Sequence, residues 1–400
     1  MLKNTRVNVS RREFLIGTTT LGAGFSLGMY LPFAASADTA KGAAIRGSEV
    51  NAWVVIEPDD TIVIRIARSE MGQGTLTGLA QLVAEELECD WTKVTTEYPT
   101  PGQSLARDRV WGSFSTGGSQ GIRGSHLYVR KGGALAREML IEAAAEAWHV
   151  PKQECTVAAS VITHMPSGRT TTYGKVAAAA AELFPPEQVK LKDPSDWKLI
   201  GQPVKRLDTA DKLTGKQLFG ADLQLPGMLN AAIKACPTFG GSLKSFDDTK
   251  VRKLPGVRKV LRVGEDAVAV VAETWWQAKT ALDALPITWD RGENVQVDSA
   301  SIEAMLDEGL SAKEAFVGNR VGDFKRAIAD ADRIVEATYR YPFQNHATME
   351  TMNATARWSE ERCEVWCPTQ NGEAALQAAA KAAGLPANRC EVYKIHLGGG

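Results

Sequence analysis

Two stretches of the chain place a glutamine in a polar, glycine-containing turn just before a predicted helix. The first reads SEMGQGT at 69–75 and the second reads PTQNG at 368–372. A glutamine side chain offers both hydrogen-bond donors and an acceptor, and glycines let backbone N–H groups approach a ligand closely. Turns of this kind suit a ligand that is anionic or rich in polar atoms. Gly72, Gln73 and Gly74 are therefore candidate binding residues. For 69–75 the alternative is an ordinary helix start that binds nothing.

Two further segments of small residues could also hold an anion. STGGS at 115–119 precedes a long helix that is predicted to reach 148, with a break at GG 132–133. Free N–H groups and the helix dipole favour negative charge at such a start, although a plain N-cap without a ligand is the alternative. GGG at 398–400 follows a predicted strand, where glycines allow close backbone approach. The candidates from these segments are Thr116, Gly117, Gly118, Ser119, Gly398, Gly399 and Gly400.

Both glutamine turns lie within the same order of predicted elements. A β-hairpin at 51–67 leads into the first turn, which is followed by a helix with one apolar stripe and by a strand at 93–98. The second turn is followed by a helix at 373–383 and by a strand at 390–397. The two copies predict two related halves that face a shared cleft. Elsewhere the patterns predict helices at 170–183 and 298–310, strands at 258–262 and 267–272, and a strand at 334–341.

Bulk composition excludes several classes of function. A chain of 400 residues is long enough for two or three domains. Its formal net charge is −1, so there is no basic excess that would favour nucleic acid as a partner. The five histidines and six cysteines are scattered, without Cys-x-x-Cys or His-Glu-x-x-His spacing. The sequence therefore predicts no metal site and no iron–sulfur site built by this chain alone.

The N-terminus has the pattern of a targeting segment. SRREFL at 10–15 opens an uncharged run that ends in ASA at 35–37, a small-residue cleavage site. Paired arginines before a moderately apolar run resemble a bacterial twin-arginine export signal. A membrane anchor is the alternative, but several glycines and Pro32 weaken it. Residues 1–37 thus predict export of the folded protein to the periplasm, either free there or associated with the membrane.

Taken in order, these motifs resemble one known family over residues 49–400. The TQN turn, the helix after it, LPANR at 385–389 and the glycine run resemble the molybdopterin-binding subunit of the xanthine dehydrogenase/aldehyde oxidase family. EMGQG near the N-terminus resembles one branch of that family, the isoquinoline 1-oxidoreductase beta subunits. The resemblance implies a multi-domain α+β fold in which an α/β-hammerhead domain is inserted between molybdopterin-binding α/β domains. The implied limits are 49–195 for the first molybdopterin-binding region, 200–295 for the hammerhead domain and 315–400 for an incomplete second region.

The same resemblance implies a chemistry. In the family the turn glutamine, here Gln370, lies beside an oxo ligand of molybdenum, and the other candidates contact the cofactor. The implied cofactor is molybdopterin with molybdenum, in the cytosine dinucleotide form. The implied reaction oxidises an N-heteroaromatic compound or an aldehyde with oxygen from water. Electrons would pass to [2Fe–2S] clusters on a small iron–sulfur partner subunit, with a cytochrome as a further acceptor.

Two departures from the family pattern leave a second hypothesis open. The family's general base is a glutamate near the far end of a longer subunit, and no residue here matches it. The glycine run normally continues with Phe-Gly, and this chain ends at Gly400. His346 and Glu350 are better explained as a hydrogen-bonded structural pair than as an acid–base pair, with Glu350 kept as a secondary candidate. The alternative function is a non-catalytic exported remnant or binding protein that lacks the catalytic C-terminal half.

Overall fold

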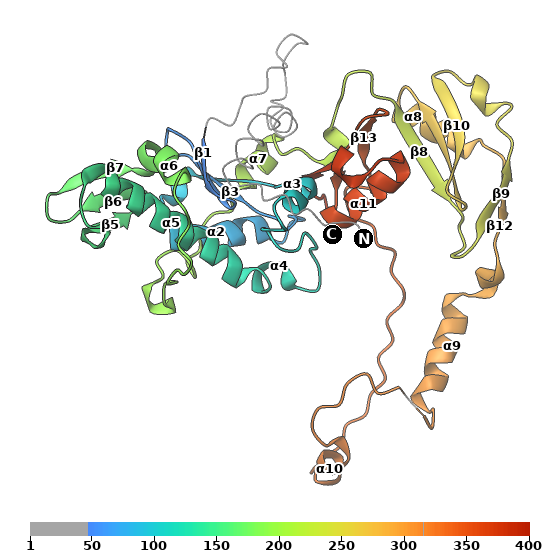
Figure 1. Ribbon diagram of the computed structural model, residues 1–400. Coiled ribbons are helices and arrows are strands. Elements are labelled where there is room, and N and C mark those ends of the chain that lie inside the picture. Colours follow the sequence, from blue (N-terminus) through green and yellow to red (C-terminus); the bar gives the residue numbers. More distant parts are fainter. Residues whose placement is uncertain (1–46, 315) are drawn as a thin grey trace, which may run out of the picture. The chain divides into compact units, whose positions relative to one another are not determined.

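The computed structural model describes residues 47–314 and 316–400, which form two compact units (Figure 1). The first unit contains the described residues up to Leu223 together with 348–400, and the second contains 224–347. The first region and the end of the chain, far apart in sequence, therefore belong to one unit. The predicted export signal at 1–37 lies outside the described residues. In the part of the chain that is described, no helix combines the length and apolar character needed to cross a membrane.

The first unit is built around a four-stranded sheet in the order β1-β2-β3-β4. Its strands are β1 (Ser48–Asn51), β2 (Val54–Ile56), β3 (Ile62–Arg65) and β4 (Val94–Glu97). The predicted hairpin is confirmed, because β2 and β3 pair antiparallel, with Val54 opposite Ile64. β3 and β4 pair in parallel, which requires a crossover, and α2 (Thr75–Leu87) supplies it. The predicted apolar stripe of α2 is buried, including Leu79, Val83 and Leu87.

The helix after 115–119 differs from its prediction. A short helix α4 (Gln120–Arg123) ends at Gly124, and α5 (His126–Trp148) runs unbroken through Gly132 and Gly133. The predicted break at these two glycines is wrong. A Cβ on Gly133 would overlap the Val83 carbonyl oxygen, and one on Gly132 would lie 2.8 Å from the Trp53 ring. The glycines thus allow close packing of α5 on α2 and on the hairpin, and they do not interrupt the helix.

A smaller three-stranded antiparallel sheet, β5-β6-β7, follows α5 in the same unit. Its strands are β5 (Cys155–Ala158), β6 (Val161–His164) and β7 (Arg169–Thr172). The predicted helix at 170–183 is wrong at its start, since α6 is Tyr173–Ala181 and the threonines before it pair with β6. β-branched side chains fit a pleated strand better than a helix. The first unit also contains α3 (Pro101–Ala106) and α7 (Thr209–Thr214).

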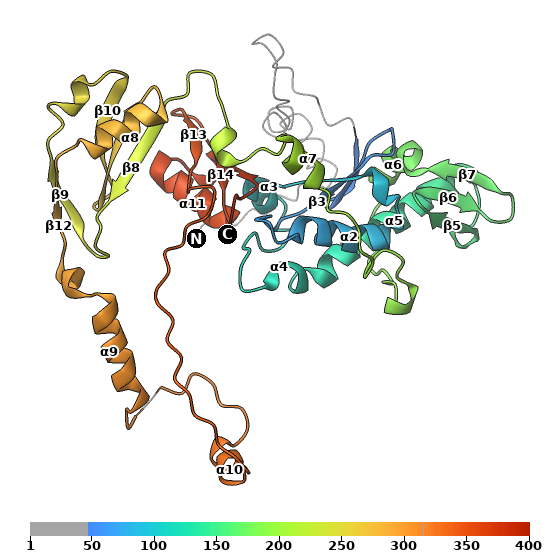
Figure 2. The ribbon, with the colours of Figure 1, turned by 180° about the vertical axis from the view of Figure 1, so that it is seen from behind.

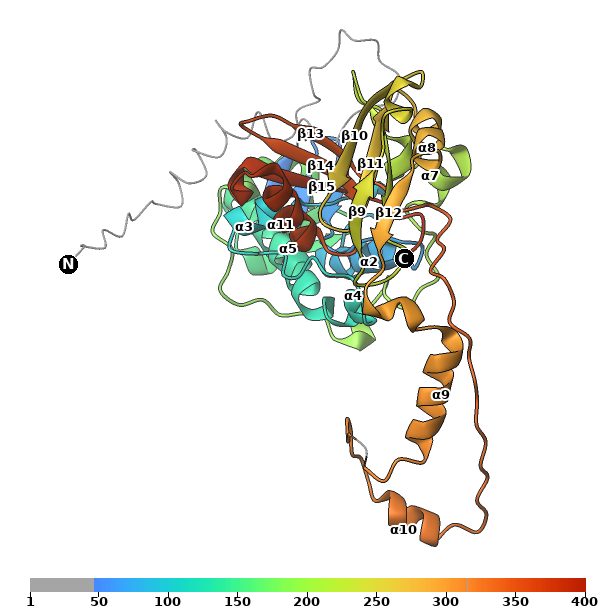
Figure 3. The ribbon, with the colours of Figure 1, turned by 90° about the vertical axis from the view of Figure 1, so that its right-hand side faces the viewer.

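The end of the chain repeats the arrangement around β3, α2 and β4. β13 (Thr355–Trp358) pairs antiparallel with β14 (Cys363–Pro368), which pairs in parallel with β15 (Cys390–Ile395). α11 (Gly372–Ala383) connects β14 to β15 and ends at Gly384, as predicted. α3 packs against both β15 and α11. Figures 2 and 3 show α3 beside α11, from behind and from the side. The predicted pair of strand–turn–helix–strand units is confirmed.

The second unit contains a small α/β core and an extended segment. β10 (Val257–Val263), β11 (Ala267–Ala272) and β8 (Asn230–Ala235) form one antiparallel sheet, and β12 (Ile287–Asp290) pairs with β9 (Ser242–Phe246). α8 (Trp275–Asp283) packs on this core through its Ala278, Ala281 and Leu282 face. The helices α9 (Ser299–Leu310) and α10 (Phe324–Ala329) follow, with no buried side chains. The predicted strand at 334–341 is wrong, since no described strand offers it a hydrogen-bonding partner.

Candidate functional site

The segment 115–119 lies against the second glutamine turn, within the first unit. The Thr116 N–H donates to the Gln370 carbonyl oxygen at 2.7 Å, and Gln370 Nε2 donates to the Thr116 carbonyl oxygen at 2.9 Å. Ser115 and Asn371 form an isolated antiparallel β-bridge. Two loops that are far apart in sequence are therefore held together by backbone as well as side-chain hydrogen bonds.

The first glutamine turn joins both of these loops and the glycine run. The Ser69 N–H donates to Thr116 Oγ1 at 2.8 Å, and the Ser69 hydroxyl donates to the Thr369 carbonyl oxygen at 2.7 Å. The Leu397 N–H, just before the glycine run, donates to the Glu70 carbonyl oxygen at 3.0 Å. The four segments that the sequence singled out thus meet at one place. We call them together the loop junction: 69–75, 115–119, 368–372 and 396–400.

Gln370 presents part of its amide to solvent at the loop junction. Its side chain is exposed, and Nε2 is fixed by Thr116. Within the described residues the amide oxygen accepts no hydrogen bond. The backbone of one loop therefore orients this amide while its carbonyl oxygen stays free for a ligand. The predicted role of Gln370 beside the cofactor stays a prediction.

The first turn is organised differently from its prediction. The N–H groups of Gly72 and Gly74 were expected to be open, but both donate to Glu70 Oε1, at 2.8 and 3.0 Å. Leu76 N–H donates to the other carboxylate oxygen at 3.0 Å. The Gln73 side chain folds back onto its own loop, accepting from Met71 N–H at 2.8 Å and donating to the Ser69 carbonyl at 3.0 Å. For these glycines the open-amide argument is wrong. Gln73 retains a main-chain N–H without an acceptor among the described residues.

Glu70 is the residue that sequence reasoning missed here. Its side chain is 1% exposed and also pairs with Arg206 at 3.1 Å. Burial alone would raise the pKa of this carboxyl, but the three amide N–H groups and Arg206 lower it below its usual value. An acidic residue just ahead of a glycine turn at a helix start was the available signal, since a carboxylate there can accept the free N–H groups.

The prediction that 115–119 forms an anion site at the start of a long helix is also wrong in part. α4 has four residues, and Ser119, at its N-cap with φ 57°, makes no side-chain capping bond. Thr116 serves as an acceptor for Ser69 and caps nothing. What the loop offers instead is exposed backbone. The N–H groups of Gly117, Gly118 and Ser119 find no acceptor in the described part of the chain, and nothing lies within 4 Å of a Cβ on either glycine.

Glu350 holds the glycine run. Gly398 N–H donates to Glu350 Oε2 at 2.8 Å, while Glu350 Oε1 accepts from Ala221 N–H at 3.2 Å and from Asn353 Nδ2 at 3.0 Å. A Cβ on Gly398 would overlap Glu350 Cβ, so only glycine fits this approach. These contacts favour a structural role for Glu350. His346 belongs to the second unit, so the predicted pairing of His346 with Glu350 stays a prediction.

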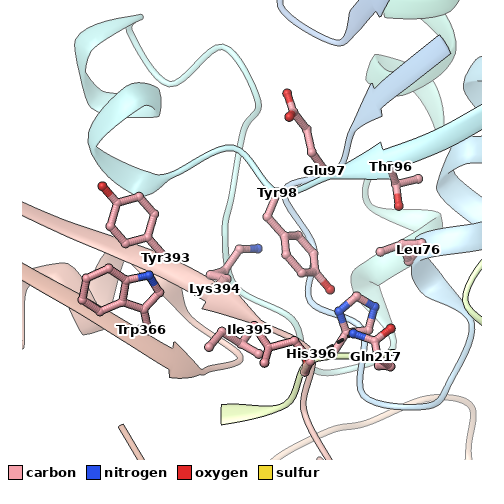
Figure 4. A pocket seen from close by; sticks show the side chains of 11 residues that line it. Leu76, Thr96, Glu97, Tyr98, Gln217, Trp366, Tyr393, Lys394, Ile395 and His396 are labelled. Carbon is pink, nitrogen blue, oxygen red and sulfur yellow. Dashed lines mark hydrogen bonds between the residues drawn. The ribbon is translucent and has the colours of Figure 1, made fainter. Parts of the chain in front are cut away.

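A cavity of about 240 Å³ opens beside the loop junction, between the ends of β4 and β15 (Figure 4). In Figure 4 the rings of Tyr98 and His396 and the side chain of Lys394 gather at its centre. The Tyr98 and His396 ring centroids are 5.6 Å apart. His396 Nε2 is buried without a hydrogen-bond partner in the described structure, and burial lowers the pKa of this imidazole. Sequence reasoning assigned no role to Lys394 or His396.

The donors at the loop junction fit an anionic cofactor rich in polar atoms. Unpaired N–H groups belong to Gln73, Gly117, Gly118, Ser119, Gly399 and Gly400, among the residues the structure describes. Gly398, Gly399 and Gly400 each sit where a Cβ would meet a neighbouring side chain within 3 Å. In the same described ranges no group of three or more His, Cys, Asp or Glu could hold a metal ion. A pterin or pyrophosphate could accept from these amides.

Comparisons with known proteins point to the same kind of ligand. The family model described as "Molybdopterin cofactor-binding domain" matches residues 4–221, and a second model of that description matches 309–400. A membrane-bound aldehyde dehydrogenase [pyrroloquinoline-quinone] of Gluconacetobacter polyoxogenes is 30% identical over 100% of this chain and 52% of its own length. The beta subunit of isoquinoline 1-oxidoreductase from Brevundimonas diminuta is 29% identical over 98% of this chain and 56% of its own. A nicotinate dehydrogenase subunit from Pseudomonas putida is 26% identical over 84% of this chain and 28% of its own.

The chain spans about half the length of the first two of these relatives, 52% and 56%. The family models together cover the loop junction and most of the first unit. The chain therefore belongs to the molybdopterin cofactor-binding domain family, among the molybdopterin-binding subunits of the xanthine dehydrogenase/aldehyde oxidase type.

Proposed function

We propose that this chain forms the molybdopterin-binding part of a molybdenum hydroxylase. The proposed enzyme oxidises an N-heteroaromatic compound or an aldehyde, takes oxygen from water, and passes the two electrons to a partner subunit. The observation that carries the proposal is the loop junction, where four segments converge. They hold Gln370 and six main-chain N–H groups that have no acceptor among the described residues. The names of the relatives support the substrate class, since they refer to an aldehyde, isoquinoline and nicotinate.

In this proposal the chain's own residues bind and orient the cofactor. The amides at 117–119 and 399–400 would donate to its anionic groups, and Gln370 would offer its carbonyl oxygen as a hydrogen-bond acceptor. Glu70 and Glu350 keep two of the loops in shape from within. The bound cofactor supplies the redox chemistry. A general base is still required, and no residue at the loop junction is assigned to that role.

The finer features of the proposal concern partners and cofactor form. We propose the cytosine dinucleotide form of molybdopterin, [2Fe–2S] clusters on a small iron–sulfur subunit, and a cytochrome as a further electron acceptor. A separate electron carrier is supported by the scattered cysteines, because Cys363, Cys367 and Cys390 are buried thiols in the strands β14 and β15. Their burial raises the pKa of each thiol, which disfavours the thiolate that a cluster needs.

We further propose export to the periplasm by the twin-arginine route. The support is the SRREFL motif at 10–15 and the cleavage-site pattern at 35–37. A protein that acquires its cofactor in the cytoplasm must cross the membrane folded. Changing Arg11 and Arg12 to lysine should leave the protein in the cytoplasmic fraction, whereas the unchanged protein is recovered from the periplasm. If the variant and the unchanged protein are distributed equally between cytoplasm and periplasm, the proposal is contradicted.

The decisive experiment is cofactor analysis of the protein purified from its native host, together with its intact mass. Stoichiometric molybdenum and pterin support the proposal. A mass well above 43.1 kDa would mean that these residues are the front of a longer hydroxylase. The same preparation is assayed for pyrroloquinoline quinone, which the name of the first relative mentions. Quinone without molybdenum would overturn the proposal, and neither cofactor would favour a non-catalytic binding protein.

A further inference from the structure

Lys394 lies in or contacts residues at or next to each of the four segments of the loop junction. It lies on β15, four residues before Gly398, and Nζ donates to the Ala67 carbonyl oxygen, just ahead of the first glutamine turn. Nζ is also 5.0 Å from the centroid of the Phe114 ring, immediately before 115–119. Its stem faces Gly372, where an added Cβ would lie 3.3 Å from Lys394 Cδ.

This ammonium group lacks a counter-ion among the described residues. The Lys394 side chain is buried, with 4% of the residue exposed, and its polar contacts are the Ala67 carbonyl and the faces of Tyr98, at 4.5 Å, and Phe114. Tyr98 itself accepts from Glu70 N–H. No carboxylate pairs with Lys394 in the described part of the chain. Buried lysines are rare unless an anion accompanies them, because an isolated charge in an apolar site is strongly disfavoured.

We propose that Lys394 is a positioning residue whose partner is the anionic cofactor, so that cofactor binding is accompanied by protonation of this lysine. The inference rests on the proposed function and adds to it a charge that the chain supplies from beneath the loops. The free amides bind the cofactor by hydrogen bonds, and Lys394 contributes the positive charge that those amides lack. The hydrogen bond to the Ala67 carbonyl and packing between the Tyr98 and Phe114 rings hold the amine in place before the cofactor arrives.

The electrostatics support this coupling. Burial, with a smaller contribution from the Arg68 guanidinium, lowers the pKa of Lys394 from 10.5 to about 7. The Cys367 thiol on β14 acts in the opposite direction but only weakly, because burial raises its own pKa to about 11. Tyr98 stays protonated because burial raises its pKa, and Phe114 and Gly372 carry no charge. An anion near Nζ would raise the pKa of Lys394 again, so the cofactor should bind with uptake of a proton.

The test compares the wild-type protein with Lys394→Met and Lys394→Arg, and with Lys381→Met as a control on the exposed face of α11. Each is purified from the native host, and the molybdenum and pterin retained per chain are measured after dialysis at several pH values. Wild type and Lys381→Met should lose apparent affinity as pH rises above about 7, by up to about tenfold per pH unit, because one proton is taken up on binding.

Lys394→Met should bind the cofactor about tenfold more weakly near neutral pH, without that slope, because it has no charge to gain or lose. Lys394→Arg should recover part of the affinity, also without the slope, because a guanidinium stays protonated throughout. A Lys394→Met protein with wild-type retention and the wild-type slope would overturn the inference and leave the proposed function standing. A wild-type protein without molybdenum or pterin at any pH would overturn both.

Discussion

Within the first unit, one buried charged side chain beside the turn of each strand–turn–helix–strand repeat can be compared with the other, Glu70 in the first repeat and Lys394 in the second. In the first, around β3, α2 and β4, Glu70 accepts three amide hydrogen bonds and forms an ion pair with Arg206. In the second, around β14, α11 and β15, Lys394 has a backbone carbonyl and two aromatic rings as its contacts. The first charge is satisfied within the protein, whereas the second is satisfied only in part. A similar order of elements therefore produces a closed scaffold at one turn and an open site at the other.

The two glutamines show the same contrast. Gln73 uses its amide within its own loop, between Met71 and Ser69. Gln370 instead reaches across to the Thr116 carbonyl, 254 residues away in sequence, and keeps its carbonyl oxygen free of described partners. A glutamine that closes its own turn stabilises the shape of that turn. A glutamine that is fixed by another loop is available to a ligand held between the loops.

Removing the carboxylate of Glu70 tests the scaffold and should have the largest effect. Glu70→Ala leaves three buried amide N–H groups without their acceptor and removes one of the two carboxylates that pair with Arg206, so the free energy of unfolding should fall by about 4 kcal/mol. Denaturant unfolding measures this loss. Glu373→Ala is a suitable control, because Glu373 pairs with Arg109 on the surface, and it should cost at most about 1 kcal/mol. Equal losses of stability for the two variants would contradict the conclusion that Glu70 holds the first glutamine turn in shape.

In the cofactor-free protein, removing the charge of Lys394 should increase the free energy of unfolding, whereas removing the Glu70 carboxylate should decrease it. The pKa of Lys394 is about 7 in the folded chain and 10.5 in the reference state, so the unfolded chain binds the proton more tightly. Stability of the wild type should therefore rise between about pH 7 and about pH 10.5, where the unfolded state holds more protons. Lys394→Met should therefore raise the free energy of unfolding by a few kcal/mol below pH 7, with the gain vanishing as pH approaches 10.

Thermal unfolding of the cofactor-free protein across this pH range checks the prediction. A Lys394→Met variant that is less stable than the wild type at pH 6 would mean that the ammonium is paired in the folded state. The comparison between the two repeats would then fail, since both buried charges would be satisfied.

The sequence predicted the repeated elements because their signals are local. Glycine at 384 ends α11, apolar spacing buries one face of α2, and turn residues separate β2 from β3. It also indicated which four segments matter, since glutamine and glycine there suit close contact with a polar ligand. Their meeting point could not be derived from periodicity. It depends on long-range hydrogen bonds such as that of Ser69 with Thr369.

The errors have a common physical cause, which is that tertiary contacts decide what a residue does. Gly132 and Gly133 were interpreted as a break, but close packing with Val83 and Trp53 explains them within an unbroken helix. The amides of Gly72 and Gly74 were expected to be free, but the nearby Glu70 carboxylate occupies them. The proposed role of Lys394 could not be predicted from the residues next to it in sequence. It depends on contacts with distant loops and on the lack of a carboxylate partner among the described residues.

The smallest expected effects come from the two glutamines, and they separate the two kinds of turn most sharply. Gln73→Ala loses hydrogen bonds to Met71 and Ser69 and should lower the free energy of unfolding by about 1 kcal/mol. Gln370→Ala loses one partly buried bond to Thr116 and should change the free energy of unfolding by about 0.5 kcal/mol. Loss of the cofactor should follow the opposite order, because among the described residues the amide oxygen of Gln370 accepts no hydrogen bond, whereas that of Gln73 accepts one from Met71 N–H. The measurement is molybdenum retained per chain alongside denaturant unfolding, for both variants. If Gln73→Ala loses more molybdenum than Gln370→Ala, the first turn itself binds the cofactor. The two turns would then not differ in function, and the hydrogen bonds of Glu70 would hold a binding loop in shape.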